Sequence, residues 1–287
     1  MKPTKKRSLI LMIKDIIVKI TSDNITGYAA QSCFYMLLSI IPFLMVLMSL
    51  VHYLPFTADN VLDIIRNIIP SQLYSYVATI VTDLYNNSSL TLTSITAIGV
   101  IWATGKGIMS ITYGLNKIYE VEERKNWFFQ RIISTLYTLV FMASIIATMI
   151  IVVFGNRLLD VLSRYSPHVA SIFEAILTNK MLFTICIMLF IILIMFKFIP
   201  NRKTNFAKEI PGALLASFGW YGFSVLFSLY VDHSPNFSYM YGSLATLIIG
   251  LMWMYFCMII VFYGAELNYF IEHRFLAPIN IHPINKK

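Results

Sequence analysis

Charged residues are scarce in this chain: only 13% of its 287 residues are Asp, Glu, Lys or Arg, and only 14 of them are acidic. An ordinary soluble domain carries about 25% charged residues, so the scarcity excludes that class of protein. Hydrophobic residues make up 58% of the chain, and the mean hydropathy is +0.72. The composition therefore predicts a protein that lives in a lipid bilayer.

Cysteine and histidine are also sparse, with three and five residues. The cysteines are far apart within apolar stretches, so we expect no disulfide. The histidines lie singly, without the short spacing of metal ligands on one element, so we expect no metal and no cofactor. The chain lacks a Walker-type glycine loop and a paired acid and base, and we expect that it is not an enzyme.

The chain does contain long apolar runs, each near the roughly 20 residues that a helix needs to cross a bilayer. We predict six transmembrane helices at about residues 30–53, 90–113, 132–154, 181–199, 210–231 and 241–265. The predicted fold is an all-α integral membrane protein in which residues 1–275 form a single polytopic domain. Residues 276–287 are predicted to be a short cytoplasmic tail.

Three further segments show apolar residues at helical spacing. Residues 1–21 combine such residues with lysines, which indicates either an amphipathic helix on an anionic membrane surface or a solvated basic tail. Residues 54–89 and 155–180, which connect predicted spans, contain apolar faces interrupted by Pro70 and Pro167. We predict amphipathic helices there, which either cap the outer end of the bundle or lie among lipid headgroups.

The basic residues predict the orientation, because loops rich in lysine and arginine resist export. Of the 22 Lys and Arg residues, 17 fall in the N-terminal segment, the loops after the second and fourth spans, and the tail. Four fall on the other side: Arg66, Arg157, Arg164 and Lys180. Both termini are predicted to be cytoplasmic. The net charge of +8 is thus a topology signal, and we expect no nucleic acid as a partner.

Lys106 is a basic residue inside the second predicted span, between Gly105 and Gly107. It either snorkels to the headgroups or faces the bundle interior and meets a partner. The glycines permit close approach of a neighbouring helix or expose backbone to a ligand. Glu266, where the sixth span leaves the membrane on the same side, is the candidate partner. The pair would be a structural clasp or a gate that a competing anion opens.

Polar residues also follow the first span. Gln31, Tyr35 and Ser39 are four apart, so they share one helix face. That face either lines a cavity or hydrogen-bonds to another helix. Pro42 and Gly99 are candidate hinges, since both weaken the helix around them, and Pro211 fits the first turn of the fifth span.

Four stretches carry a resemblance to the YihY/BrkB family of bacterial inner-membrane proteins: the first span, the run G-x-N-x-x-Y-x-V-x-E that starts at Gly114, the Pro211-Gly212 pair with its helix, and the run from Tyr241-Gly242-Ser243 to Gly264-Ala265-Glu266-Leu267-Asn268. The resemblance implies a multi-pass protein of the bacterial inner membrane. In the family the position of Lys106 is commonly arginine, and lysine keeps the charge but loses the planar fork.

Three functions follow from these observations. The first is a transporter or flippase-like protein for an amphipathic anion, with membrane lipids as the leading substrate class, because proteins similar to the family are linked to lipid movement in the envelope. The second is a scaffold that holds an envelope protein at the membrane without transport. The third is a membrane-bound ribonuclease, the family's former label. An oligomer is compatible with each.

Overall fold

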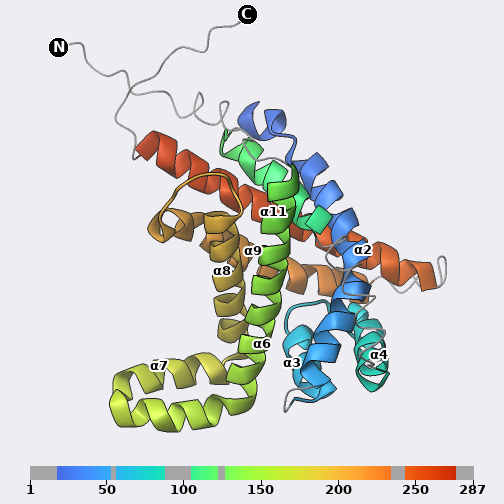
Figure 1. Ribbon diagram of the computed structural model, residues 1–287, viewed down its shortest axis with the longest axis vertical. Helices are drawn as coiled ribbons and strands as arrows, with labels where there is room; N and C mark the ends of the chain where they lie inside the picture. The colour runs from blue at the N-terminus through green and yellow to red at the C-terminus, as the bar shows by residue number, and fades with distance from the viewer. Residues whose placement is uncertain (1–17, 53–55, 88–104, 122–126, 234–242, 276–287) are drawn as a thin grey trace, which may run out of the picture.

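The computed structural model of the protein describes residues 18–52, 56–87, 105–121, 127–233 and 243–275. These residues form helices and turns, with no strand among them (Figure 1). The labelled helices are α2 (Ile25–His52), α3 (Ala58–Arg66), α4 (Ser71–Asn86), α6 (Trp127–Tyr165), α7 (Pro167–Thr178), α8 (Lys180–Phe198), α9 (Phe206–Asp232) and α11 (Ser243–Phe275). Residues 105–118 are also helical. The all-α prediction is therefore confirmed for the part of the chain that the structure describes.

Three helices are long and apolar enough to cross a membrane: Met181–Phe198 in α8, Phe206–Asp232, which is all of α9, and Leu247–His273 in α11. The two halves of α2 make a fourth if they are counted as one span. In α6, 39 residues long, the apolar part is the shorter stretch Thr135–Thr148. The prediction for 90–113 lies largely outside the described residues. The structure thus supports three or four of the six predicted spans.

Two helix ends differ from the prediction. The fifth helix begins at Phe206 rather than near 210, so Pro211 lies inside α9 and not in its first turn. The sixth helix continues to Phe275, ten residues beyond the predicted end at 265. Hydropathy marks where apolar residues stop, whereas a helix continues until its backbone groups find other partners. The polar ends of α9 and α11 therefore escaped the prediction.

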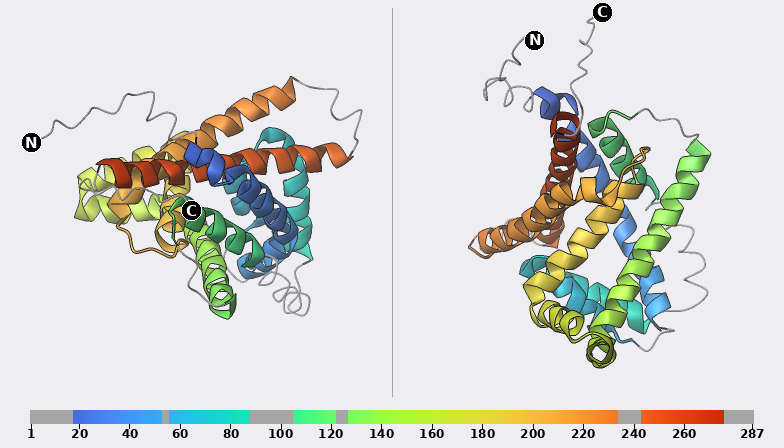
Figure 2. Two further views of the ribbon diagram at one scale, coloured as in Figure 1. Left: turned by 90° about the horizontal axis from the view of Figure 1, so that it is seen from above. Right: turned by 90° about the vertical axis from the view of Figure 1, so that its left-hand side faces the viewer.

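Helices α9 and α11 form the most extensive helix pair of the fold. They lie together at the end that holds residues 206 and 275 and separate toward residues 232 and 243 (Figure 2). The two helices thus form a V. Helix α4 partly fills its wide end, since Leu73 packs with Phe227 of α9 and Trp253 of α11. The narrow end of the V is where the polar residues described below are gathered.

Helix α2 is bent at the predicted hinge residue Pro42. Its halves, Ile25–Ile40 and Pro42–Val51, are inclined by 48°. Proline removes one backbone donor and crowds the preceding turn, which accounts for the bend. The first half packs in a core with residues 105–118, α8, α9 and α11, and the second half packs in another core with α3, α4 and α6. Motion about Pro42 stays a prediction.

The predicted outer connections contain helices α3, α4 and α7. They lie at the lower end of the molecule in Figure 1, opposite the 199–205 loop that joins α8 to α9. Helix α3 buries Val61 and Leu62 against the core that it shares with α2. The molecule therefore has two distinct ends, one closed by the 199–205 loop and one by the three shorter helices.

Candidate functional site

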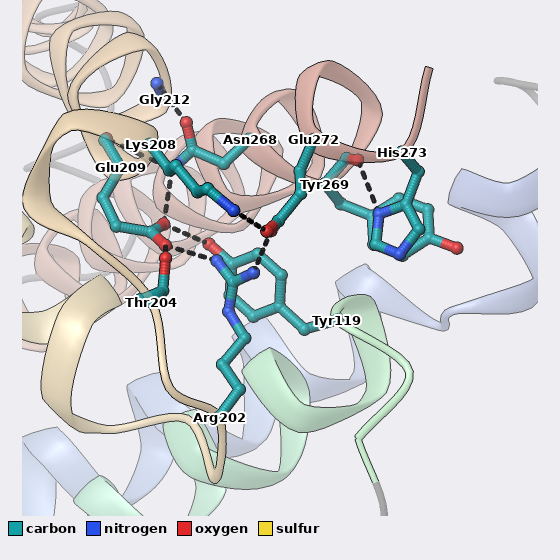
Figure 3. Close-up of polar contacts among 10 residues, drawn as sticks. All are labelled: Tyr119, Arg202, Thr204, Lys208, Glu209, Gly212, Asn268, Tyr269, Glu272 and His273. Atoms are coloured by element: carbon teal, nitrogen blue, oxygen red, sulfur yellow. Dashed lines mark hydrogen bonds and ion pairs between the residues drawn. The ribbon is translucent and has the colours of Figure 1, made fainter. Parts of the chain in front are cut away.

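The most deeply buried acidic side chain of the described residues is Glu209, near the start of α9. Its carboxylate lies at the positive end of the α9 dipole. Three neutral donors reach it: the Thr204 hydroxyl at 2.7 Å, the Asn268 amide at 3.0 Å and the Tyr119 hydroxyl at 3.1 Å. Arg202 forms an ion pair with it (Figure 3). Donors on several sides compensate the burial of this charge.

Arg202 joins two carboxylates that come from different helices. Its guanidinium pairs with Glu209 of α9 and with Glu272 of α11. Lys208 pairs with Glu272 at 2.8 Å, which balances two cations against two carboxylates. The guanidinium also lies 3.5 Å from the centroid of the Tyr119 ring. We call Tyr119, Arg202, Thr204, Lys208, Glu209, Asn268 and Glu272 the Arg202 network. It connects the 199–205 loop, α9, α11 and the end of the 105–118 helix.

Asn268 links this network to a close helix crossing. Its side-chain oxygen accepts the backbone N–H of Gly212 at 2.6 Å, and its amide donates to the backbone oxygen of Glu209 at 3.2 Å. A Cβ atom at Gly212 would lie 2.0 Å from the carbonyl oxygen of Gly264. Because no side chain fits at that distance, glycine is required here for α9 and α11 to touch.

The Tyr119 hydroxyl is held in its protonated form. Burial raises the pKa of this phenol well above its usual range, and the nearby Glu209 carboxylate raises it further, against the opposing influence of Arg202. A phenol that stays protonated donates steadily to Glu209. The two carboxylates of the Arg202 network are therefore paired in a way suited to holding helices together, while the buried Arg202 Nε has no hydrogen-bond partner among the described residues.

A second group of charges lies beside the network, around Lys19. Its ammonium pairs with Asp23 at 2.7 Å and with Glu120 at 3.2 Å, and it lies 4.0 Å from the centroid of the Tyr269 ring. Burial alone would raise the pKa of Glu120, but a hydrogen bond from Tyr269 and the Lys19 charge outweigh it and hold that pKa below its usual value. We call Lys19, Asp23, Glu120, Glu266 and Tyr269 the Lys19 cluster.

Glu266 belongs to the Lys19 cluster and not to Lys106. Its side chain is 2% exposed, and neither carboxylate oxygen has a hydrogen-bond partner among the described residues. The charged groups that face it are Asp23, Lys19 and Glu120. The predicted Lys106–Glu266 pair is wrong, because α11 extends past Glu266 and the two residues lie at different depths. Gly114 meets Phe262 of α11, and Lys106 lies eight residues earlier, about 12 Å along the helix.

Lys106 lies over Tyr35, a residue of the predicted polar face of the first span. Its ammonium is 5.5 Å from the centroid of the Tyr35 ring, within reach of a cation–π interaction. Gly105 and Gly107 are buried, and a Cβ atom at Gly107 would lie 3.7 Å from the Tyr35 Cβ, an ordinary contact. The structure therefore brings Lys106, Gly107 and Tyr35 together where the 105–118 helix meets α2.

The predicted polar face of α2 is divided between different surroundings. Gln31 is exposed, Tyr35 is half-buried, and Ser39 is buried and donates to the backbone oxygen of Met36 at 2.9 Å. A buried hydrogen bond of 3.0 Å joins Ser32 to Ser110 across the helix contact. That bond is of the kind that holds membrane helices together. The candidate hinge Gly99 lies outside the described residues.

Sequence reasoning did not select Arg202, Glu209 or Glu272, although it counted Arg202 among the basic loop residues. Charges near predicted span ends look like solvated residues until the helices are assembled. The usable signal was the set of quoted motifs, because Tyr119, Gly212 and Asn268 come from three of them: Tyr119 and Asn268 donate to Glu209, and Gly212 donates to Asn268. Short motifs from separate spans were thus a pointer to one buried site.

A groove lies at the other end of the molecule, between the α3–α4 corner and helices α8 and α9. Its volume is about 540 Å³. Arg66 is one of its lining residues, 5.6 Å from the centroid of the Tyr74 ring, and several residues with hydroxyl groups also line it. The hydroxyl residues are Ser71, Tyr74, Thr184, Tyr221, Ser224 and Ser228. The groove joins a cation and several hydroxyls to apolar side chains, a combination that suits an amphipathic anion.

Comparison with known proteins extends over nearly the whole chain. The model of the family described as "Virulence factor BrkB" matches residues 16–286. A "Putative ribonuclease-like protein YfkH" of Bacillus subtilis is 29% identical over 269 residues, which cover 93% of this chain and 97% of that protein. "UPF0761 membrane protein VV0203" of Vibrio vulnificus is 26% identical over 277 residues, with 93% and 84% covered. No solved structure matches the chain.

Proposed function

Since this chain belongs to the Virulence factor BrkB family, which includes membrane proteins, we propose that it binds an amphipathic anion and moves it across the bilayer. Membrane lipids are the leading substrate class. The observation that supports this proposal is the groove at the α3–α4 corner, because it offers a cation and hydroxyls beside apolar walls.

The walls of the groove indicate how a lipid would enter. Met181, Val225 and Leu229 line it, and their side chains are 48%, 45% and 51% exposed. These residues belong to the candidate spans of α8 and α9, whose apolar surface would face acyl chains in a membrane. A lipid lying against that surface would place its phosphate toward Arg66 without taking its chains out of an apolar environment.

Lys106, where the 105–118 helix meets the first half of α2, supplies the second part of the proposal. With both termini cytoplasmic, the groove faces the outer leaflet, and Lys106 lies toward the inner leaflet as a further contact for a phosphate. The bend of α2 at Pro42 separates these two levels. Movement between them needs a second conformation, in which α2 changes its bend or α9 and α11 change their separation.

The test is lipid movement in vesicles that contain the purified protein and fluorescent anionic or neutral lipids. We expect faster movement of the anionic lipid than in empty vesicles, and a loss of about tenfold or more in Arg66→Ala and in Lys106→Ala, because each substitution removes a phosphate contact worth about 1.5–3 kcal/mol. The matched control is Arg164→Ala, which removes an exposed basic residue from the same predicted side, away from the groove.

The outcomes separate the candidate functions. If Arg66→Ala and Arg164→Ala reduce lipid movement equally, the movement depends on the overall positive charge of that side. This result would contradict a binding site at the groove. No movement by any folded variant would favour the scaffold function, which the closed Arg202 network also favours because it fixes one end of the molecule.

We also propose that the chain is not an enzyme. One relative carries "ribonuclease-like" in its name, but the carboxylates of the Arg202 network are already held by cations, and a general base needs an accessible reaction partner. Purified protein is expected to leave RNA intact. Cleavage that disappears on substitution of Glu209, Glu266 or Glu272 would overturn this proposal.

A further inference from the structure

Glu266 differs from the other buried carboxylates of the described residues in having no partner. Glu209 has four donors and Asp23 has Lys19, whereas both oxygens of Glu266 lack a hydrogen bond. The Asp23 carboxyl group lies within hydrogen-bonding range of Glu266, but two carboxylates offer no donor, so a hydrogen bond between them requires a proton on one of the two. An ionised carboxylate buried in this way is so unfavourable that such groups take up a proton instead.

The charges around Glu266 support the same conclusion. The groups facing it are Lys19 and Asp23 from the segment before α2, Glu120 from the turn after residue 118, and Tyr269 on α11. His273 stacks on Tyr269 at the outer edge of the cluster, at 4.1 Å between ring centroids. One ammonium therefore faces three carboxyl groups, and it is already paired with two of them. The cations of the adjacent Arg202 network are committed to Glu209 and Glu272.

Two residues with positive φ lie at the Lys19 cluster, one next to its member Asp23 and one a member itself. Asn24 has a φ of 50° and Glu120 a φ of 53°, and they are the only such non-glycine residues in the described part of the chain. Glu120 ends the 105–118 helix, since the Val121 N–H bonds back to the Asn116 oxygen at 2.9 Å. Glycine is usual at such a position, and a bulkier residue there stores strain of about 1–3 kcal/mol. The backbone is therefore strained next to Asp23 and at Glu120, the two residues that pair with Lys19.

We propose that Glu266 is a proton-binding site, and that its proton decides which carboxylate holds Lys19. With the proton bound, Glu266 is neutral and Lys19 stays on Asp23 and Glu120, as in this structure. When the O–H bond of Glu266 breaks, the electron pair stays on the carboxylate and the proton passes to water on the side of Glu120, whose side chain is 62% exposed. The new carboxylate then attracts Lys19 and draws the segment of residues 18–24 toward α11.

Only the biological role of this proton site rests on the proposed function: binding and release of the proton would be coupled to lipid movement. The ligand itself is a proton, and its presence can be tested without transport. In the folded state Glu266 holds a proton that the unfolded chain releases, so this residue makes the protein less stable as the pH rises.

The first experiment is infrared spectroscopy of the purified full-length protein, which detects protonated carboxyl groups by their carbonyl absorption. At pH 7 we expect one such band that is lost in Glu266→Gln and kept in Glu272→Gln. Glutamine has the shape of the protonated acid, so Glu266→Gln is expected to fold, and its thermal stability should vary less with pH. A wild-type spectrum without the band, or a band that survives in Glu266→Gln, would overturn the proposal.

A second variant tests the role of Lys19. Because Lys19 stabilises the ionised form of Glu266, Lys19→Met is expected to keep the carboxyl band up to a higher pH than the wild type. An unchanged titration would contradict the exchange of partners. In the vesicle assay, a rate of lipid movement that changes neither with pH nor in Glu266→Gln would refute proton coupling. It would not contradict lipid binding at the groove. A normal carboxyl band without lipid movement would leave the proton site standing and refute the proposed transport.

Discussion

Arg202 and Glu209 illustrate how individual charges are kept inside this molecule. Glu209 is fully buried and Arg202 nearly so, and each has partners besides the other. Burying two charges is expensive, but removing one partner of a buried pair is more harmful, since the remaining charge then lacks compensation. The pair therefore contributes specificity in how α9, α11 and the 199–205 loop are arranged.

The first prediction concerns this pair. Arg202→Met is expected to destabilise the protein by about 3–5 kcal/mol, because Glu209 and Glu272 lose their shared cation. Adding Glu209→Gln should restore part of that loss, so that the double variant costs less than the sum of the singles. The measurement is the thermal midpoint in detergent by size-exclusion chromatography of heated samples. Additive losses would mean that the two residues act independently.

The second prediction concerns Lys106, which lies on Tyr35 and not on Glu266. A double-mutant cycle of Lys106→Ala and Tyr35→Ala is expected to give a coupling energy of about 0.5–1 kcal/mol, the usual range of a cation–π contact. The matched cycle of Lys106→Ala with Glu266→Ala should give additive effects. Coupling in the second cycle alone would mean that Lys106 and Glu266 meet after all.

At the scale of helices, the crossing of α9 and α11 is the contact with least tolerance for change. Gly212 and Gly264 face one another, and small residues surround them: Ala213 and Ala216 on α9 and Ala265 on α11 are all fully buried. Backbone contact at this point lets Asn268 reach both Gly212 and Glu209. The geometry of the Arg202 network thus depends on two glycines that are not themselves members of the network.

The third prediction follows from that contact. Gly212→Ala is expected to lower the thermal midpoint sharply, because its Cβ would lie 2.0 Å from a backbone oxygen and α9 would have to move away from α11. Gly222→Ala is the matched control on the same helix, since nothing lies within 4 Å of its Cβ. The control should be neutral or stabilising by up to about 1 kcal/mol, because alanine favours helix more than glycine does. Equal effects of the two substitutions would contradict the close crossing.

At the scale of the whole molecule, the charged and polar residues gather in two separate regions. The Arg202 network and the Lys19 cluster lie at the narrow end of the α9–α11 V, and the groove with Arg66 is lined by residues in the half of α9 that leads to the wide end. The predicted topology places the first end in the cytoplasm and the second outside. The proposed transport uses the groove with Arg66 near one leaflet and Lys106 toward the other, because a headgroup must find a binding site on each side of the membrane.

The fourth prediction tests the orientation. In a cysteine-free background, a membrane-impermeant maleimide added to intact cells is expected to label His233→Cys and to leave Lys203→Cys unlabelled until the cells are permeabilised. Both residues are exposed, His233 after α9 and Lys203 in the 199–205 loop, so access is decided by the side of the membrane. Labelling of Lys203→Cys in intact cells would reverse the topology and place the groove in the cytoplasm.

Prediction from sequence succeeded best for α8, where an apolar run of nearly the right length became the helix Lys180–Phe198. It was less accurate for α9 and α11, because their polar ends extend beyond the apolar stretches that hydropathy detects. It failed for the partner of Glu266, since that choice depended on matching two depths from uncertain helix ends. The contact between Lys106 and Tyr35 was not predicted, because the sequence does not tell which faces of two helices meet.

The sequence alone determined the solvent and the class of this protein, because apolar composition and helix length are properties of single segments in a bilayer. It also contained the motifs that identify the family. Only the tertiary structure decided which charges meet. Arg202, Glu209 and Glu272 are far apart in the chain or look solvated, and they form one network because two glycines let α9 and α11 touch. Partner choice in a membrane protein depends on helix rotation and depth, which no single segment encodes.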